Sequence, residues 1–308
     1  MLTAIRLRNL GVIEYQAGRY AEAEPRMVAA QAVLEQQLGA DHPTVAQSYF
    51  DRAALYASLD RLQEAETLYR RALEVRRRRL GDAHPATGQS LQMLGILLAQ
   101  QRRWDEAEAA TGEALEIFRA IDPRHFEVGK ATHGLGRIAE GRGQLEAAER
   151  YFAEAVERFR EALGERHPFV WISTGDLARA MARPGQFAEA EARMREAREQ
   201  LLEIVGPEHE YSGEAALRLG DLLHRAGRPD EAIELLREAV AVFHDQLGAR
   251  HQRVAQARYQ LAAALVAAGA PAAAEAAAAL ELERQLDPAS PRIAELERWA
   301  AGTVGPLR

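Results

Sequence analysis

Histidine recurs at nearly constant spacing, and imidazole is a common protein ligand of zinc. The six residues are His42, His84, His125, His167, His209 and His251, with steps of 42, 41, 42, 42 and 42 residues. If one step is one structural repeat, neighbouring histidines lie on the order of 20 Å apart, about two helix diameters. Ligands of one metal ion must converge within a few ångströms. We therefore predict no metal site and expect each histidine to cap a helix or pack against its start.

No other set of residues predicts catalysis. The run from Gly134 to Gly143 looks superficially like a dinucleotide-binding loop, but no strand precedes it. We find no Ser/His/Asp arrangement, no phosphate loop and no carboxylates at metal-binding spacing. The sequence therefore predicts a protein that is not an enzyme and uses no cofactor. Gly134 and Gly141 are glycines that the other repeats lack, so we expect the helix carrying them to be the loosest.

Two more sets of residues recur with the period of the histidines and indicate the helices of each repeat. A small residue occupies Gly11, Ala53, Gly95, Gly136, Ala178, Gly220 and Ala262, and an alanine occupies Ala23, Ala65, Ala107, Ala148, Ala190, Ala232 and Ala274. Three independent markers that keep one period predict a repeat array. The two small positions lie about twelve residues apart, which suits the crossing point of two closely packed helices.

The sequence of each repeat predicts two antiparallel helices joined by a short turn. In the first repeat, apolar residues at helical spacing end near Gly18, and a second amphipathic stretch runs to about Leu38. Gly39 then suits a left-handed residue past a helix end, and Pro43 suits the first turn of the next helix. Asp60 and Arg102 replace the turn glycine in two repeats, so we expect a costlier backbone conformation there.

We predict a repeat array over residues 1–287 and a capping helix with a frayed tail over residues 288–308. The predicted repeats are 1–38, 43–80, 85–121, 126–163, 168–205, 210–247 and 252–286. The capping helix is expected near Ile293–Ala301, because a helical array must cover its last apolar face. The first repeat lacks the Leu-Gly-x-x-His-Pro run before Gly11. This is expected of a piece of a longer protein, or of an array without its first turn.

The repeated motifs resemble those of a known family. Leu-Gly-x-x-His-Pro, Asp/Gly-Arg-x-x-Glu-Ala-Glu and the run Tyr69-Arg70-Arg71-Ala72-Leu73 are similar to the 42-residue tetratricopeptide repeats of the kinesin light chain type. This resemblance covers nearly the whole chain. It implies an all-α, right-handed solenoid of about seven antiparallel helix hairpins with a C-terminal capping helix. The high alanine and arginine content is typical of a bacterial source.

The resemblance also implies where a ligand would bind. In similar proteins the first helix of each hairpin lines a concave groove, in which an Asn two residues before the small position grips the backbone of a bound peptide. Here only Asn9 retains that residue type. The other repeats carry Asp51, Met93, Gly134, Asp176, Arg218 and Gln260 at this position.

The groove positions identify candidate binding residues. They are Phe50, Met93, Lys130, His133, Arg137, Asp176, Arg179, Arg183, Arg218, Asp221, Arg225 and Tyr259. The basic side chains of the fourth to sixth repeats predict contact with an acidic partner segment, and Arg179 and Arg218 could each bind a carboxylate in a bidentate manner. In the alternative interpretation these charges pair with one another on a solvated face. The aromatic and aliphatic candidates would seat apolar side chains.

Composition limits the remaining possibilities. The chain has 308 residues, no cysteine and a formal net charge of −7, which argues against a nucleic-acid or anionic-membrane surface. We expect a cytoplasmic, noncatalytic scaffold that binds a protein or peptide. The alternative is a ligand-responsive regulatory module of a larger signalling protein, which switches by a change of curvature. The four arginines Arg76–Arg79 are interpreted as structural, because they complement the C-terminal dipole of a helix.

Overall fold

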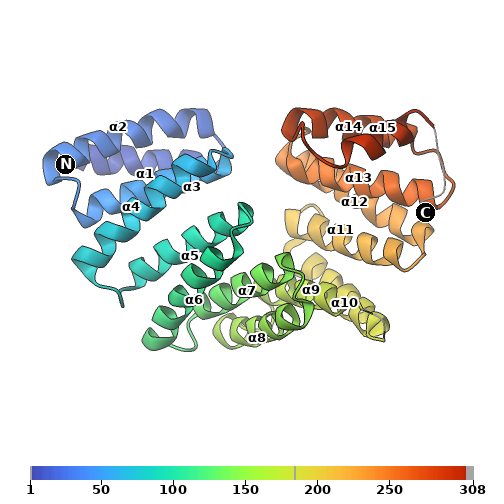
Figure 1. Cartoon of the computed structure of the whole chain (residues 1–308), viewed down its shortest axis with the longest axis horizontal. Coiled ribbons are helices and arrows are strands. Elements are labelled where there is room, and N and C mark those ends of the chain that lie inside the picture. Colours follow the sequence, from blue (N-terminus) through green and yellow to red (C-terminus); the bar gives the residue numbers. More distant parts are fainter. Residues whose placement is uncertain (1, 184, 303–308) are drawn as a thin grey trace. The chain divides into compact units, whose positions relative to one another are not determined.

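The computed structural model describes residues 2–183 and 185–302, which form fifteen α-helices and no strand within those ranges. The chain divides into two compact blocks, residues 1–162 and 163–308, which we call the N-terminal and C-terminal blocks. Within each block, consecutive helices pair as antiparallel hairpins that stack on one another (Figure 1). The all-α solenoid fold predicted from the sequence is confirmed.

Four hairpins form the N-terminal block. Their helices are α1 (Leu2–Gln16), α2 (Tyr20–Leu38), α3 (Pro43–Ser58), α4 (Leu62–Leu80), α5 (Pro85–Gln100), α6 (Trp104–Ile121), α7 (Phe126–Gly141) and α8 (Leu145–Leu163). The first helix of a hairpin also packs on the second helix of the preceding hairpin, as α5 does on α4. Tyr49, Tyr69 and Phe152 are among the largest fully buried side chains of this block.

Three hairpins and a final helix form the C-terminal block. They are α9 (Pro168–Met181), α10 (Phe187–Val205), α11 (Glu210–Arg225), α12 (Pro229–Leu247), α13 (Gln252–Ala267), α14 (Ala273–Leu286) and α15 (Ile293–Ala300). Helix α15 buries Leu296 and Trp299 against α13 and α14. It covers the apolar face at that end of the array, as the sequence led us to expect.

Small residues allow the two helices of a hairpin to cross closely. A Cβ placed on Gly95 would lie 3.2 Å from the carbonyl oxygen of Ala107, and one on Gly220 would lie 3.4 Å from that of Ala232. Ala53 and Ala65, the pair at the same positions in α3 and α4, are both fully buried. At Gly95 and Gly220 even the Cβ of alanine would clash, with the Thr111 hydroxyl and the Leu236 side chain respectively. At Ala53 and Ala65 a larger side chain would force the crossing helices apart.

The six repeating histidines are helix N-caps. In each case Nδ1 accepts a hydrogen bond from the backbone N–H two residues later, for example from Thr44 to His42 at 3.1 Å and from Phe169 to His167 at 3.2 Å. The same bond forms at His84, His125, His209 and His251. The imidazole thus satisfies one of the free N–H groups at the helix start, a role usually filled by Ser, Thr, Asp or Asn.

Positive φ angles occur both in the hairpin turns and after the ends of second helices. Asp60 and Arg102 both have φ of 58°, so the two hairpin turns without glycine use the conformation predicted to be costly. Gly39 differs from the expected left-handed residue, because its φ of 79° is combined with a ψ of 151°. That combination is essentially restricted to glycine, since any Cβ would clash with the backbone.

The extra glycines of α7 have a packing role that the sequence did not indicate. The ring of Trp104, at the start of α6, lies where a Cβ of Gly141 would be. A Cβ on Gly134 would come within 3.3 Å of the methyl group of Thr111. The absence of side chains at Gly134 and Gly141 of α7 therefore leaves room for Thr111 and Trp104 of α6.

Candidate functional site

One surface in each block is formed by the exposed sides of the first helices of the hairpins, and we call it the first-helix face. Its residues lie six and two before and one and five after the small position, so they share one side of each helix. Successive first helices touch one another, α1 with α3 and α5 with α7 in the N-terminal block, and α9 with α11 and α11 with α13 in the C-terminal block. Axes of packed helices lie about 8–10 Å apart, so each touching pair presents its parts of the face side by side.

The face changes character along the N-terminal block. Helix α1 contributes Ile5, Asn9, Val12 and Gln16; α3 contributes Gln47, Asp51, Ala54 and Ser58; α5 contributes Gln89, Met93, Ile96 and Gln100; and α7 contributes Lys130, Gly134, Arg137 and Gly141. Amides and aliphatic groups dominate the first three helices, and cations appear only on α7.

A buried polar network occupies the α3 part of this face. The Gln47 amide donates to Asp51 at 2.7 Å, and Arg8 lies 3.5 Å from the same carboxylate. Arg76 of α4, only 2% exposed, donates to Gln47 at 2.7 Å and to Ser90 of the next hairpin at 2.8 Å. Burial lowers the pKa of Arg76 to about 10 and raises the pKa of Asp51. These polar groups bind one another and so link three hairpins.

The predicted anchor Phe50 belongs to this same network. Its ring makes an edge contact with Tyr69, with centroids 5.4 Å apart, and the Arg76 guanidinium lies 4.6 Å from the ring centroid. Arg76 therefore has a structural role, as predicted, through contacts with neighbouring hairpins. The remaining three arginines also contact other hairpins, since Arg77 pairs with Glu113, and Arg78 and Arg79 both pair with Asp41.

Helix α5 presents an aliphatic stripe between two amides. Ile96 is 43% exposed, Met93 is half-buried, and Gln89 and Gln100 are exposed at either end of the same side. Within the described ranges neither amide has a hydrogen-bonding partner. Primary amides carry both donors and acceptors and so match a peptide backbone. The sequence analysis selected Lys130 and Arg225 at the equivalent positions of other repeats but not these two glutamines, because it selected charged and apolar side chains there.

Helix α7 supplies the cations of the N-terminal block. Lys130 pairs with Glu127 at 3.1 Å and lies 5.5 Å from the Phe126 ring. The His133 ring packs against Phe152, with centroids 5.2 Å apart. Arg137 is exposed and has no ion pair with any residue that the structure describes. Of the three predicted residues on this helix, Arg137 is the one presented most openly.

In the C-terminal block the two predicted carboxylate-binding arginines share one carboxylate. Asp176 is fully buried, and Arg179 and Arg218 approach its Oδ1 at 2.8 and 3.1 Å. Arg218 also pairs with Glu214 at 2.8 Å and donates to the carbonyl oxygen of Ile172 at 3.3 Å. This is the internal pairing that the sequence left open as an alternative. An incoming carboxylate would have to compete with Asp176 for both cations.

The other charged candidates of this block have partners of their own. Arg183 donates to Gln186 at 2.9 Å. Asp221 accepts a hydrogen bond from Gln260 at 3.4 Å and lies 3.9 Å from Arg225, whose side chain is half-exposed. Burial raises the pKa of Asp221, and the nearby cations Arg225 and His224 partly offset that effect. Arg225 is therefore more accessible to a ligand than Arg218.

Tyr259 is used by the capping helix. Its hydroxyl donates to Glu295 at 2.7 Å, its ring stacks on Trp299 with centroids 5.6 Å apart, and Arg292 lies 4.9 Å from the ring centroid. Burial and the bond to Glu295 raise the pKa of Tyr259 to about 12. The sequence predicted Tyr259 as an apolar contact for a ligand, whereas in the structure its ring and hydroxyl contact Trp299 and Glu295 of α15.

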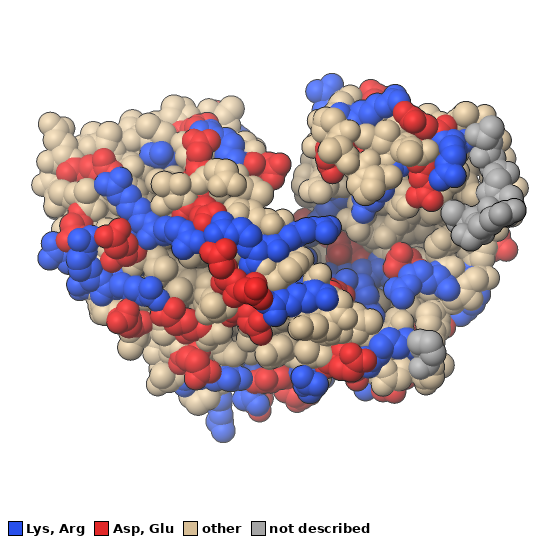
Figure 2. Space-filling model, in the orientation of Figure 1, with Lys and Arg blue, Asp and Glu red and all other residues tan. Residues whose placement is uncertain are grey.

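Charges of both signs are interspersed on the visible surface of each block (Figure 2). The described ranges contain no group of three His, Asp or Glu residues that could hold a metal ion. No helix in those ranges is both long and apolar enough to cross a membrane. The exposed groups of the first-helix face can form hydrogen bonds, apolar contacts and ion pairs.

Stacked helical hairpins with an exposed first-helix face define an α-helical repeat protein. The family model of the tetratricopeptide repeat matches residues 2–78, 51–120, 127–203 and 211–286, which is most of the chain. The chain belongs to the tetratricopeptide repeat family. No curated protein matches it.

Several solved structures share the fold. Nearly identical TPR-like repeats of a kinesin light chain candidate from Podosopora anserina are 23% identical, with 66% of this chain and 97% of that one covered and a TM-score of 0.54. A Rap conjugation gene regulator of a plasmid, solved with the Phr* peptide, is 18% identical, with 97% and 75% covered and a TM-score of 0.66. A signal-transduction ATPase with a tetratricopeptide repeat sensor, from Pyrococcus horikoshii, is 18% identical, with 96% and 44% covered and a TM-score of 0.63. At these identities the likeness shows the fold alone.

Proposed function

We propose that this protein is a noncatalytic scaffold whose first-helix face binds an extended peptide or protein segment. The observation that carries the proposal is the α5 and α7 surface, where Gln89, Ile96, Gln100 and Arg137 are exposed. The described residues include no hydrogen-bonding or ion-pairing partner for any of these four. The likeness to a Rap regulator solved with a peptide supports this class of ligand.

Each exposed group has a part in this proposal. The amides of Gln89 and Gln100 bind the ligand backbone, since they can donate and accept together. Ile96 contacts an apolar side chain, and Arg137 binds a carboxylate in a charge-assisted hydrogen bond. Adjacent helix axes lie about 8–10 Å apart, which is close to the length of three extended residues. The preferred ligand thus carries an apolar residue and, about three residues away, an acidic one.

We extend the proposal to the C-terminal block, where the main expected contact with the ligand is an ion pair. Arg225 is the predicted contact for an acidic group, because its pair with Asp221 is long and its side chain is half-exposed. Arg179 and Arg218 contribute mainly by holding Asp176, and Arg183, which follows the end of α9, donates to Gln186. A neutral or basic peptide would not use these residues.

Selection of random twelve-residue peptides displayed on phage tests the proposal. We expect enriched peptides to combine an aliphatic and an acidic residue at the stated spacing. The variants Ile96→Asp and Arg137→Glu should each weaken binding of a selected peptide at least tenfold. Gln89→Ala with Gln100→Ala should do the same, whereas Gln36→Ala with Gln37→Ala, two exposed amides of α2, should not. Binding that is indifferent to the substitutions on α5 and α7 would reject this site.

A second role is proposed because one structural relative contains a repeat sensor within a signal-transduction ATPase. In this role peptide binding changes the curvature of the array and so the activity of an attached domain or partner. Small-angle scattering with and without a selected peptide distinguishes the two roles. A changed radius of gyration supports the switch, and an unchanged one supports the static scaffold.

A further inference from the structure

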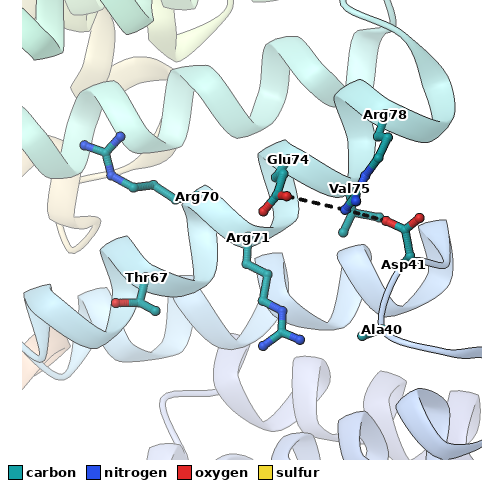
Figure 3. A pocket seen from close by; sticks show the side chains of 8 residues that line it. All are labelled: Ala40, Asp41, Thr67, Arg70, Arg71, Glu74, Val75 and Arg78. Atoms are coloured by element: carbon teal, nitrogen blue, oxygen red, sulfur yellow. Dashed lines mark ion pairs between the residues drawn. The ribbon is translucent and has the colours of Figure 1, made fainter.

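A pocket of about 580 Å³ lies on the opposite side of the N-terminal block, where the second helices are exposed. It is lined by Ala40, Asp41, Thr67, Arg70, Arg71, Glu74, Val75 and Arg78 (Figure 3). Helix α4 supplies most of these residues, and the link between α2 and α3 supplies the first two. None of them belongs to the first-helix face.

An ion pair that links neighbouring second helices elsewhere in the block is not formed at Arg71, which lines this pocket. Arg77 of α4 pairs with Glu113 of α6, and Arg119 of α6 pairs with Glu154 of α8 at the same position one repeat later. The corresponding residues of α2 and α4 are Glu35 and Arg71, with the charges reversed.

Glu35 and Arg71 do not form an ion pair with each other. Glu35 accepts hydrogen bonds from the Tyr49 hydroxyl at 2.6 Å and from Gln31 at 2.9 Å. It therefore binds groups of α2 and α3 and forms no ion pair with Arg71.

Arg71 is held in place without being neutralised. Its guanidinium carbon lies 4.7 Å from the centroid of the Tyr49 ring, a cation–π contact. Among the described residues no carboxylate lies within ion-pairing distance of it. Contact with a ring face leaves the N–H edges of a guanidinium free to bind two oxygens side by side.

The other charges of the pocket are paired. Asp41 binds Arg78 and Arg79, each at 2.6 Å, and Glu74 lies 3.5 Å from Arg78. Arg70 pairs with Glu66 at 2.8 Å. In Figure 3 the Arg71 side chain extends away from the Glu74, Arg78 and Asp41 pairs, and Arg70 extends in another direction. Arg71 is thus the unmatched cation of the pocket.

We propose that this pocket is a second binding site, which takes the carboxylate or phosphate group of a ligand in bidentate contact with Arg71. The oxyanion takes the place of the Glu35 carboxylate, which is bound to Tyr49 and Gln31 instead of to Arg71. Since the site shares no residue with the first-helix face, both sites can be occupied together. Its existence does not depend on the peptide site.

Nuclear magnetic resonance of the arginine side-chain Nε–H groups tests this site. The protein is titrated with inorganic phosphate and, separately, with a tetraglutamate peptide, at ionic strength held constant with sodium chloride. We expect a saturable shift of the Arg71 signal with a dissociation constant on the order of 1 mM, since one charge-assisted bidentate contact is weak by itself. A response to phosphate alone assigns a phosphorylated ligand, a response to the peptide alone assigns a carboxylate ligand, and either supports the site.

Matched variants separate this site from general charge attraction. Arg71→Gln should weaken binding at least tenfold. The affinity of Arg71→Lys should lie between those of the unsubstituted protein and Arg71→Gln, because lysine keeps the charge and loses the planar fork. Arg150→Gln is the control, since Arg150 is exposed on α8 of the same block. No saturable shift at Arg71 with either probe would overturn the proposal. So would an equal shift at Arg150, or binding unchanged by Arg71→Gln in protein with an unaltered circular dichroism spectrum.

Discussion

Gly136 of α7 lies directly against the ring of Phe152 of α8. A Cβ on residue 136 would come within 2.7 Å of two ring carbons, and Phe152 is fully buried. Gly175 occupies the middle of α9 in a different setting, because its Cβ would lie 3.5 Å from Arg218 and 3.7 Å from Met194, which is ordinary contact. An added methyl group would therefore clash at Gly136 and fit at Gly175.

Alanine substitutions should separate these two glycines by the sign of their effect on stability. We predict that Gly136→Ala lowers the free energy of unfolding by about 1–3 kcal/mol through overpacking. Gly175→Ala should raise it by about 0.5–1 kcal/mol, because alanine restricts the unfolded chain and is the better helix former. Urea unfolding followed by circular dichroism measures both. A stabilising Gly136→Ala would mean that Phe152 moves freely.

Asp176 should be the most sensitive charged residue of the C-terminal block. Asp176→Ala leaves Arg179 and Arg218 without their shared buried carboxylate, and we predict a loss of about 3–5 kcal/mol. Glu234→Ala, which breaks an exposed pair with Arg237, should leave stability nearly unchanged. Urea unfolding at neutral pH compares the two variants. Equal effects would contradict a special role for Asp176.

The histidine caps should make stability fall in mild acid. Protonation of Nδ1 removes the acceptor for the helix N–H, and burial lowers the pKa of His167 and His251. Between that lowered pKa and the ordinary value near 6.5, the folded state binds fewer protons than the unfolded state. The free energy of unfolding should therefore decrease as pH falls through this range and be independent of these groups above it.

Asparagine variants test the origin of that pH dependence. Asparagine caps helices well and does not titrate, so His167→Asn with His251→Asn should keep most of the neutral-pH stability. The difference in unfolding free energy between pH 7.5 and pH 5.5 should shrink in this variant. An unchanged pH dependence would assign it to groups other than these two caps.

Equivalent aliphatic residues should differ in importance along the array. Ile13 of α1 is 57% exposed, whereas Leu97, at the same position two repeats later, is 1% exposed under α4 and α6. Leu97→Ala should cost about 2–5 kcal/mol, and Ile13→Ala should cost less than about 1 kcal/mol. Thermal unfolding of both variants provides the measurement. A large effect at Ile13 would show that this side chain is covered in solution.

Much of the architecture could be predicted from the chain alone, because its physical causes act locally. Close crossings require small residues, so Gly95 and Ala107 mark a hairpin wherever they recur twelve residues apart. A helix start needs an acceptor within two residues, and His42 provides one before Pro43. These requirements involve neighbours in sequence or within one hairpin, and spacing expresses them directly.

Only the tertiary structure decided which polar groups remain available to a ligand. Arg218 and Asp176 are far apart in sequence, and whether they pair depends on how closely α9 and α11 pack and on which rotamers fit between them. Likewise, Arg71 and Arg77 are both arginines of α4, yet only Arg77 has a carboxylate within reach on the neighbouring second helix. Ion pairing falls steeply with distances of a few ångströms, which repeat spacing cannot resolve. The period determined where the helices are, and side-chain packing between repeats determined what their surfaces can bind.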